Sequence, residues 1–292
     1  MKKLLILCSV CCILYNPLFG TANMPEQQTN EEIKGHLFIH GGDLITTEQR
    51  QRFLELAGGT NAKILFIPFG DPNIAGWAEQ GARAAERWRN LGAQADYIVF
   101  EKGDADLEEN LRKLDGVTGV WFSGGNQIRH AEWLLGTQFL ERIREIYIQG
   151  GALGGSSAGA AVMSEIMFTG RMPHNINLTL TFPYIREGNV GIAEGFAFID
   201  FAIIDQHFLQ RQRQSRLLNL VIEHNLPGIG IDESTAVIFS RGSRTFEVFG
   251  QRTVMVFEPR FVTPPRTDER KNLSADLIEM RILLSGDRYT LK

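Results

Sequence analysis

The sequence predicts an α/β fold, in which one mostly parallel β-sheet is covered by helices on both faces. Short apolar runs recur along the chain, and most are separated by stretches with the 3.6-residue spacing of amphipathic helices. Of the 292 residues, 43% are hydrophobic and 30 are glycines, which is typical of a globular α/β protein with many tight turns. From Thr235 on, the apolar runs follow one another without helical stretches between them. This last part therefore predicts antiparallel strands at one edge of the sheet.

The predicted strands and helices follow one another along most of the chain. Leu217, Leu220 and Val221 illustrate the helical spacing, because they recur on one face of a helix. No internal repeat and no linker interrupts the pattern, so residues 35–292 are predicted to form a single domain. The predicted strands are residues 35–40, 63–68, 97–100, 117–122, 146–153, 202–205, 228–231, 236–239 and 252–257, and the predicted helices are residues 47–56, 74–91, 107–114, 128–147 and 209–224.

The N-terminal segment has the pattern of a secretory signal peptide. Lys2 and Lys3 precede an apolar run at residues 4–15, and small residues at 20–22 suit cleavage near Ala22. The run is too short to span a bilayer comfortably, and the alternative is a buried first strand. We therefore expect residues 1–22 to be a signal peptide, followed by a disordered leader at 23–34. The mature protein would be exported, to the periplasm or the medium, without a lipid or membrane anchor.

Composition and charge argue against several classes of function. The formal net charge of −4 does not favour binding to nucleic acid. All three cysteines lie within residues 8–12, so the mature chain would have no thiol, which excludes a cysteine nucleophile and a cysteine metal site. His36 and His40 share one face of a predicted strand, but no third ligand is spaced to complete a metal site. We therefore expect no metal site.

Polar or glycine-rich clusters follow several predicted strands. In open α/β sheets, ligands bind beyond the carboxyl ends of the strands, so these clusters predict one site there. The clusters are residues 40–43, 70–71, 123–127, 155–157, 205–207 and 232–234.

Ser157 is the candidate nucleophile of that site. It lies within the run 154–163, where an apolar segment turns through small residues into a predicted helix. A serine at such a turn is exposed, and the next N–H, that of Ala158, lies at the positive end of the helix dipole, where an oxyanion would form. A glycine-built turn or a phosphate-binding loop is the alternative.

A serine nucleophile needs a base and an acid that orients the base. His207 ends a predicted strand and is flanked by Asp205 and several arginines, which makes it the candidate base. Glu233 ends the following strand and is the candidate acid, although Asp232 would serve equally well. If His207 is the base, activity should rise with a pKa around the reference of about 6.5, moved upward by the carboxylate.

An α/β-hydrolase esterase is an alternative to this interpretation. Residues 155–159 satisfy Gly-x-Ser-x-Gly, and residues 40–42 are similar to an esterase oxyanion loop. In that fold, however, the histidine comes after the acid and near the C-terminus. Here the order is Ser157, His207, Glu233, and no histidine follows His224. The order of the three residues argues against an esterase.

Four segments of the chain resemble the cyanophycinases, a family of serine peptidases whose group also holds aspartyl dipeptidases. The resemblance covers roughly residues 35–260. It implies a flavodoxin-like α/β sandwich similar to a class I glutamine amidotransferase domain, an enzyme without metal or cofactor, and a homodimer. The segments are residues 122–127, 154–163, 205–217 and 230–236.

The resemblance also implies roles for individual residues. Ser157 matches the nucleophile, His207 the general base and Glu233 the orienting acid. The backbone N–H groups of Asn126 and Ala158 match the oxyanion hole. The family often has aspartate where this chain has Asn126, which leaves specificity open if the carboxylate matters.

The substrate implied by the resemblance is cyanophycin, a polyaspartate whose β-carboxyl groups carry arginine. Such a polymer presents carboxylates and guanidinium groups, which arginines and acidic residues can pair with. The product would be β-Asp-Arg dipeptides. Small aspartyl or isoaspartyl peptides are an alternative substrate class, and a non-catalytic binding protein of the same fold is a further alternative. The residues that match substrate-binding positions are Gln127, Asp205, Gln206, Arg211, Arg213 and Arg216.

Overall fold

The computed structural model describes residues 32–170 and 184–292. Within these ranges the chain from Glu32 to Lys292 belongs to one compact unit. The predicted signal peptide and most of the predicted leader lie outside the described residues. In the described part of the chain, no helix is long and apolar enough to cross a membrane.

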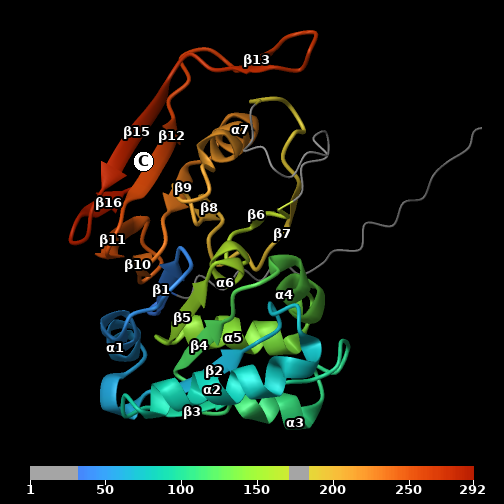
Figure 1. Cartoon of the computed structure of the whole chain (residues 1–292), viewed down its shortest axis with the longest axis vertical. Helices are drawn as coiled ribbons and strands as arrows, with labels where there is room; N and C mark the ends of the chain where they lie inside the picture. The colour runs from blue at the N-terminus through green and yellow to red at the C-terminus, as the bar shows by residue number, and fades with distance from the viewer. Residues whose placement is uncertain (1–31, 171–183) are drawn as a thin grey trace, which may run out of the picture. The chain divides into compact units, whose positions relative to one another are not determined.

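The main sheet has eight strands in the order β16-β11-β10-β1-β5-β4-β2-β3 (Figure 1). Five strands are parallel, and three strands of the C-terminal part extend the sheet antiparallel beyond β1. This confirms the predicted mostly parallel sheet with an antiparallel extension. The parallel strands are β1 (His36–His40), β2 (Lys63–Ile67), β3 (Gln94–Tyr97), β4 (Gly119–Phe122) and β5 (Ala152–Ser156), and the others are β10 (Thr235–Ser240), β11 (Thr245–Gly250) and β16 (Arg288–Thr290).

Both faces of the main sheet are buried. Leu37 and Ile39 of β1 belong to one hydrophobic cluster, whereas Phe38 between them belongs to another. This alternation places the two clusters on opposite faces of the strand, as expected for a sheet covered on both sides. The helices are α1 (Thr47–Leu56), α2 (Trp77–Arg89), α3 (Glu108–Leu111), α4 (Gln127–Leu134), α5 (Gln138–Ile148), α6 (Ala158–Ala161) and α7 (Gln214–His224), with 3-10 turns at Gly59–Asn61, Ile74–Gly76 and Arg112–Leu114.

A second, four-stranded sheet differs from the expectation of a single sheet. Its order is β15-β12-β9-β8, with β8 and β9 parallel and the other pairs antiparallel. Helix α7 packs on it through Leu217 and Leu220, which join Phe208 and Phe257 in a third hydrophobic cluster (Figure 1). The strands are β8 (Ile203–Gln206), β9 (Gly228–Ile231), β12 (Val254–Pro259) and β15 (Ile278–Leu283), and two short hairpin sheets are formed by β6 (Ile166–Phe168) with β7 (Ile192–Glu194) and by β13 (Arg266–Thr267) with β14 (Leu273–Ser274).

Several predicted boundaries are wrong. The predicted helix 128–147 is two helices, because the chain turns at Gly136 and Thr137 caps a new helix by accepting from the Leu140 N–H. Residues 146–148 are the end of α5 and not the start of a strand. The predicted helix 209–224 begins only at Gln214.

Candidate active site

A strained turn places Ser157 between β5 and α6. Its φ of 55° and ψ of −110° lie outside the regions that most residues adopt. The flanking glycines permit the close approach of other backbone segments: a Cβ on Gly155 would lie 2.3 Å from the Gly159 oxygen, and one on Gly159 would lie 2.3 Å from the Phe122 oxygen. The turn is anchored to β1, because the Ser157 N–H donates to the His40 carbonyl at 3.0 Å.

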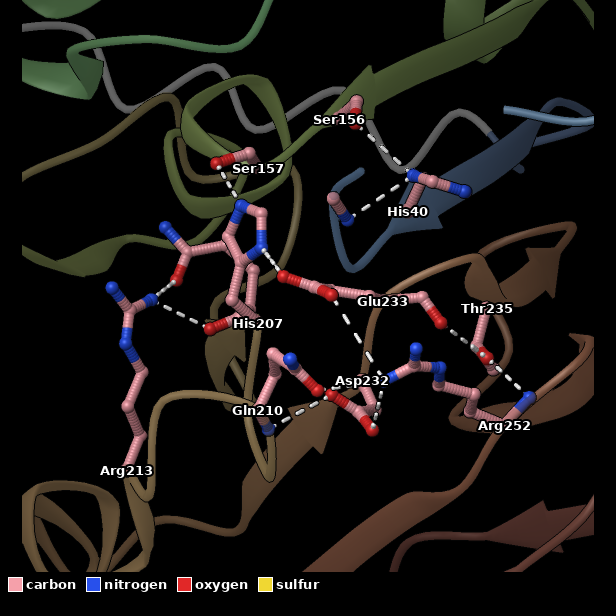
Figure 2. A network of polar contacts seen from close by, with 12 residues as sticks. His40, Ser156, Ser157, His207, Gln210, Arg213, Asp232, Glu233, Thr235 and Arg252 are labelled. Atoms are coloured by element: carbon pink, nitrogen blue, oxygen red, sulfur yellow. Dashed lines mark hydrogen bonds and ion pairs between the residues drawn. The ribbon is translucent and has the colours of Figure 1, made fainter. Parts of the chain in front are cut away.

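Ser157, His207 and Glu233 form a continuous hydrogen-bonded line (Figure 2). The Ser157 Oγ lies 2.9 Å from His207 Nε2, and His207 Nδ1 lies 2.7 Å from Glu233 Oε1. A carboxylate can only accept, so Nδ1 carries the proton and Nε2 is free to accept the Ser157 proton. The main sheet supplies the serine, while His207 follows β8 and Glu233 follows β9 of the second sheet. The arrangement is that of a nucleophile, a base and an orienting acid.

The pKa of His207 is lowered from its ordinary value of 6.5. Burial is the largest cause, and the charges of Arg211 and Arg213 act in the same direction. The hydrogen bond with Glu233 raises the pKa but does not outweigh them. The upward shift expected from the sequence is therefore wrong, because that expectation included the carboxylate and left out burial. A lowered pKa keeps the imidazole neutral and able to accept a proton at neutral pH.

Arg252 supports the acid, and nothing in the sequence analysis singled it out. Its Nη1 lies 3.9 Å from Glu233 Oε2 and 3.7 Å from Asp232 Oδ2. It also donates to Gln210 Oε1 at 2.8 Å, and the Gln210 N–H donates to Asp232 Oδ1 at 3.2 Å (Figure 2). Asp232 therefore holds the loop after His207, and Glu233 is the carboxylate that contacts the imidazole.

The structure contradicts the prediction that the Asn126 N–H lines the oxyanion hole. This N–H donates to the Gly70 carbonyl at 2.7 Å, and the Asn126 side chain accepts from the Ile128 N–H at the start of α4. Among residues 32–170 and 184–292, the N–H groups of Gly125 and Ala158 have no hydrogen-bond partner. Gly124 adjoins the serine, since a Cβ on it would lie 3.6 Å from the Ser157 Cβ. The Ala158 N–H, directly after Ser157 in the chain, and the Gly125 N–H, next to Gly124, are thus candidate donors for an oxyanion.

Most of the residues predicted to bind substrate form a buried network. Asp205 is fully buried and pairs with Arg216, whose Nε donates to Asp205 Oδ2 at 2.7 Å and whose Nη2 donates to Oδ1. Arg213 donates through Nη1 to the Gln206 carbonyl at 2.6 Å and to its side-chain oxygen. Asp205 and Arg216 are thus paired with each other inside the protein, as buried charges must be, and Gln206 lies beside them with little exposed surface.

Arg211 is the exposed member of the predicted arginine group. Arg213 is partly buried, with 15% of its side chain accessible. Gln127 is also buried, and its Nε2 donates to the Phe168 carbonyl, so its amide supports the wall beside the site. In the described part of the chain, no group of three or more His, Cys, Asp and Glu side chains could hold a metal ion.

Known proteins resemble this chain in sequence and in fold. The model of the family described as Peptidase family S51 matches residues 37–246. A cyanophycinase of Synechococcus elongatus is 31% identical over 264 residues, covering 87% of this chain and 76% of the relative. A cyanophycinase of Geminocystis herdmanii is 32% identical over 268 residues, covering 87% and 90%. A solved peptidase structure from an acI-B1 actinobacterium has a TM-score of 0.63 at 24% identity over 89% of this chain and 98% of that one, which shows a shared fold.

Proposed function

Because the chain belongs to peptidase family S51, we propose that this serine-type peptidase hydrolyses cyanophycin to β-Asp-Arg dipeptides through an acyl-enzyme. The mechanism rests on two hydrogen bonds, from Ser157 Oγ to His207 Nε2 at 2.9 Å and from His207 Nδ1 to Glu233 Oε1 at 2.7 Å. The substrate rests on the two cyanophycinases, which are 31% and 32% identical to this chain.

In the first half of the proposed reaction, the Ser157 Oγ attacks the scissile carbonyl carbon. Its proton moves to His207 Nε2, while the Nδ1–H stays on the imidazole and donates to the Glu233 carboxylate. The carbonyl oxygen becomes an oxyanion, which the N–H groups of Gly125 and Ala158 stabilise. The C–N bond then breaks, and the leaving amine takes the proton from His207. In the second half, water adds to the ester in the same way, and the C–O bond to Ser157 breaks.

Arg211 is the group we assign to a substrate carboxylate. It is exposed and lies four residues after the base, and its backbone N–H donates to the His207 carbonyl at 3.0 Å. Guanidinium groups bind carboxylates through two parallel hydrogen bonds. The buried pair of Asp205 and Arg216 would act indirectly, by holding Gln206 and Arg213 beneath the base.

The substrate is tested by incubating the enzyme separately with purified cyanophycin and with β-aspartyl dipeptides. Release of β-Asp-Arg from the polymer is the expected result. Activity on dipeptides alone would replace the proposal with the aspartyl dipeptidase alternative. Ligand binding without turnover of either substrate would favour the non-catalytic binding protein.

The mechanism is tested by replacing the serine. Ser157→Ala should remove activity, since loss of a triad nucleophile costs on the order of a millionfold in rate. A sulfonyl fluoride should label wild-type enzyme on Ser157 and leave the variant unlabelled. Ser156→Ala should retain part of the activity. An active Ser157→Ala enzyme would show that the nucleophile is assigned wrongly.

We also propose that the protein is exported after cleavage near Ala22, on the basis of the lysines and apolar run at its N-terminus. N-terminal sequencing of protein from the periplasm and the medium of an expressing bacterium should give a chain that starts near residue 23. Recovery of the full-length chain in the cytoplasm alone would contradict export.

A homodimer is the proposed assembly. Strand β15 lies at one end of the second sheet and carries exposed apolar side chains at Met280 and Ile282, followed by Leu284. Apolar side chains on an edge strand suit burial against another chain. Light scattering should give the mass of two chains, and Ile282→Lys should shift it toward one. An unchanged mass in this variant would place the interface elsewhere.

A further inference from the structure

His40 is a buried imidazole that the proposed mechanism does not use. It is the last residue of β1 and has no exposed surface. Its Nδ1 lies 3.0 Å from the Ser156 Oγ and accepts the Gly42 N–H at 3.1 Å (Figure 2). Since a backbone N–H can only donate, Nδ1 carries no proton, and the Ser156 hydroxyl must donate to it as well.

The loop that follows His40 contacts the base and the residue next to the acid. The His207 N–H donates to the Gly41 carbonyl at 2.7 Å, and the Ser234 N–H, next to the acid, donates to the Gly42 carbonyl at 2.9 Å. Gly42 has a φ of 112° and lies against the imidazole of the base, because a Cβ on it would be 2.3 Å from His207 Nε2. Residues 40–42 thus connect the strand end before the nucleophile with the base and the acid.

The imidazole is kept at a cost to the fold. With Nδ1 unprotonated, the proton of neutral His40 is on Nε2, which makes no well-formed hydrogen bond among the residues that the structure describes, although the Gln49 side chain interacts with the imidazole. A buried donor without an acceptor is destabilising, and an apolar side chain of the same size would avoid the loss. Burial also lowers the pKa of His40 to about 4, so Nδ1 remains an acceptor at neutral pH. An apolar residue could not supply the hydrogen-bond acceptor that Nδ1 provides.

We propose that His40 is a positioning residue, whose Nδ1 fixes Gly42 against the His207 ring and fixes the strand end before Ser157. This inference rests on the proposed roles of Ser157 and His207. It assigns no contact with substrate to His40. Its effect is on the orientation of the base, so the rate of nucleophile activation should change and substrate binding should not.

The experiment compares two replacements of His40. His40→Leu removes the acceptor, and kcat should fall by roughly 100-fold with KM unchanged, which is the loss expected for a displacement of about 1 Å. His40→Asn places Oδ1 where Nδ1 lies and should restore kcat to within about fivefold of wild type, since one hydrogen bond of altered geometry is affected. Ser156→Ala should give a smaller loss than His40→Leu.

His36 provides a matched control on the same strand. Its Nδ1 lies 2.9 Å from the Ser240 Oγ, about 13 Å along β1 from His40, and it is not part of the site. His36→Leu should leave kcat unchanged. Thermal unfolding of each variant checks that the fold is retained, and His40→Asn and Ser156→Ala serve if His40→Leu does not fold.

The rate of labelling by a sulfonyl fluoride distinguishes failure of this inference from failure of the proposed function, because the reagent needs no substrate. Labelling of Ser157 that is fast in wild type and His40→Asn, and slow in His40→Leu, supports the inference. Equal rates in all three would overturn it and leave the triad in place. No labelling of Ser157 in the wild type would overturn the triad itself.

Discussion

Replacing Arg216 with methionine should destabilise the protein far more than loss of an ordinary ion pair. Arg216 is 4% exposed and its partner Asp205 is 0% exposed, so the variant would leave a buried carboxylate with only Arg213 Nη1, 3.6 Å from Oδ1, as a cationic partner. Breaking a buried pair in this way typically costs about 3–5 kcal/mol. For a chain of this size, that loss lowers Tm by on the order of 10 °C.

Differential scanning calorimetry can measure this loss against two comparison variants. Arg112→Met breaks an exposed helical pair with Glu108, whose side chains are 70% and 68% accessible, and should change stability by about 0.5 kcal/mol or less. The double variant Asp205→Leu with Arg216→Met removes both charges of this pair and should recover part of the loss, because Arg213 then lacks its contact with Asp205. If Arg216→Met and Arg112→Met lower Tm equally, the buried network does not support the site as we describe it.

Three further outcomes follow from the electrostatics of the site. Since burial and Arg211 lower the pKa of His207, kcat/KM should stay high below pH 6.5. Arg211→Gln should move the acid limb of the pH–rate profile to higher pH, and an unmoved limb would contradict this cause. Arg252→Gln should lower kcat by less than about fivefold, because the half-exposed guanidinium lies 3.9 Å from Glu233; a complete loss would mean that it has a direct catalytic role. Burial lowers the pKa of His130 to about 4, so as the pH falls the unfolded chain binds a proton at a higher pH than the folded protein does. The free energy of unfolding, measured with urea, should therefore fall by about 3 kcal/mol between pH 6.5 and pH 4. The same pH dependence in His130→Gln would refute this cause.

The local pattern of the chain was enough to predict the α/β class and the parallel core. Strands such as residues 63–67 and 228–231 are short apolar runs bounded by turns, and the helix at residues 47–56 buries Phe53 and Leu54 and has a capping box at Thr46. The predicted boundaries of elements were wrong where the same residues suit both a strand and a helix. Residues 146–148 are apolar enough for a strand, yet they complete the buried face of α5 before Gly150 turns the chain.

The sequence predicted those features of the candidate site that depend on residue type and on order along the chain. Ser157, His207 and Glu233 follow strand ends, and their side chains have the right chemistry for a nucleophile, a base and an acid. The hydrogen bond from Asn126 to Gly70 could not be predicted, because it depends on how two loops 56 residues apart approach each other. The same holds for Arg252, which reaches Glu233 only after β9 and β12 pair.

The sequence by itself determined the fold class and the candidate nucleophile, because periodicity and the glycine-flanked serine turn are local properties of the chain, whereas the choice of Glu233 over Asp232 as the acid came from the family resemblance. Only the tertiary structure decided which polar side chains are buried and which groups they pair with. Asp205 and Arg216 have the chemistry of substrate-binding groups in the sequence, but folding buries both, and a buried charge must find its partner within the protein. Folding also brings a second sheet to the serine and His40 to the loop beside the base. Burial and long-range pairing, which no local pattern encodes, set those roles.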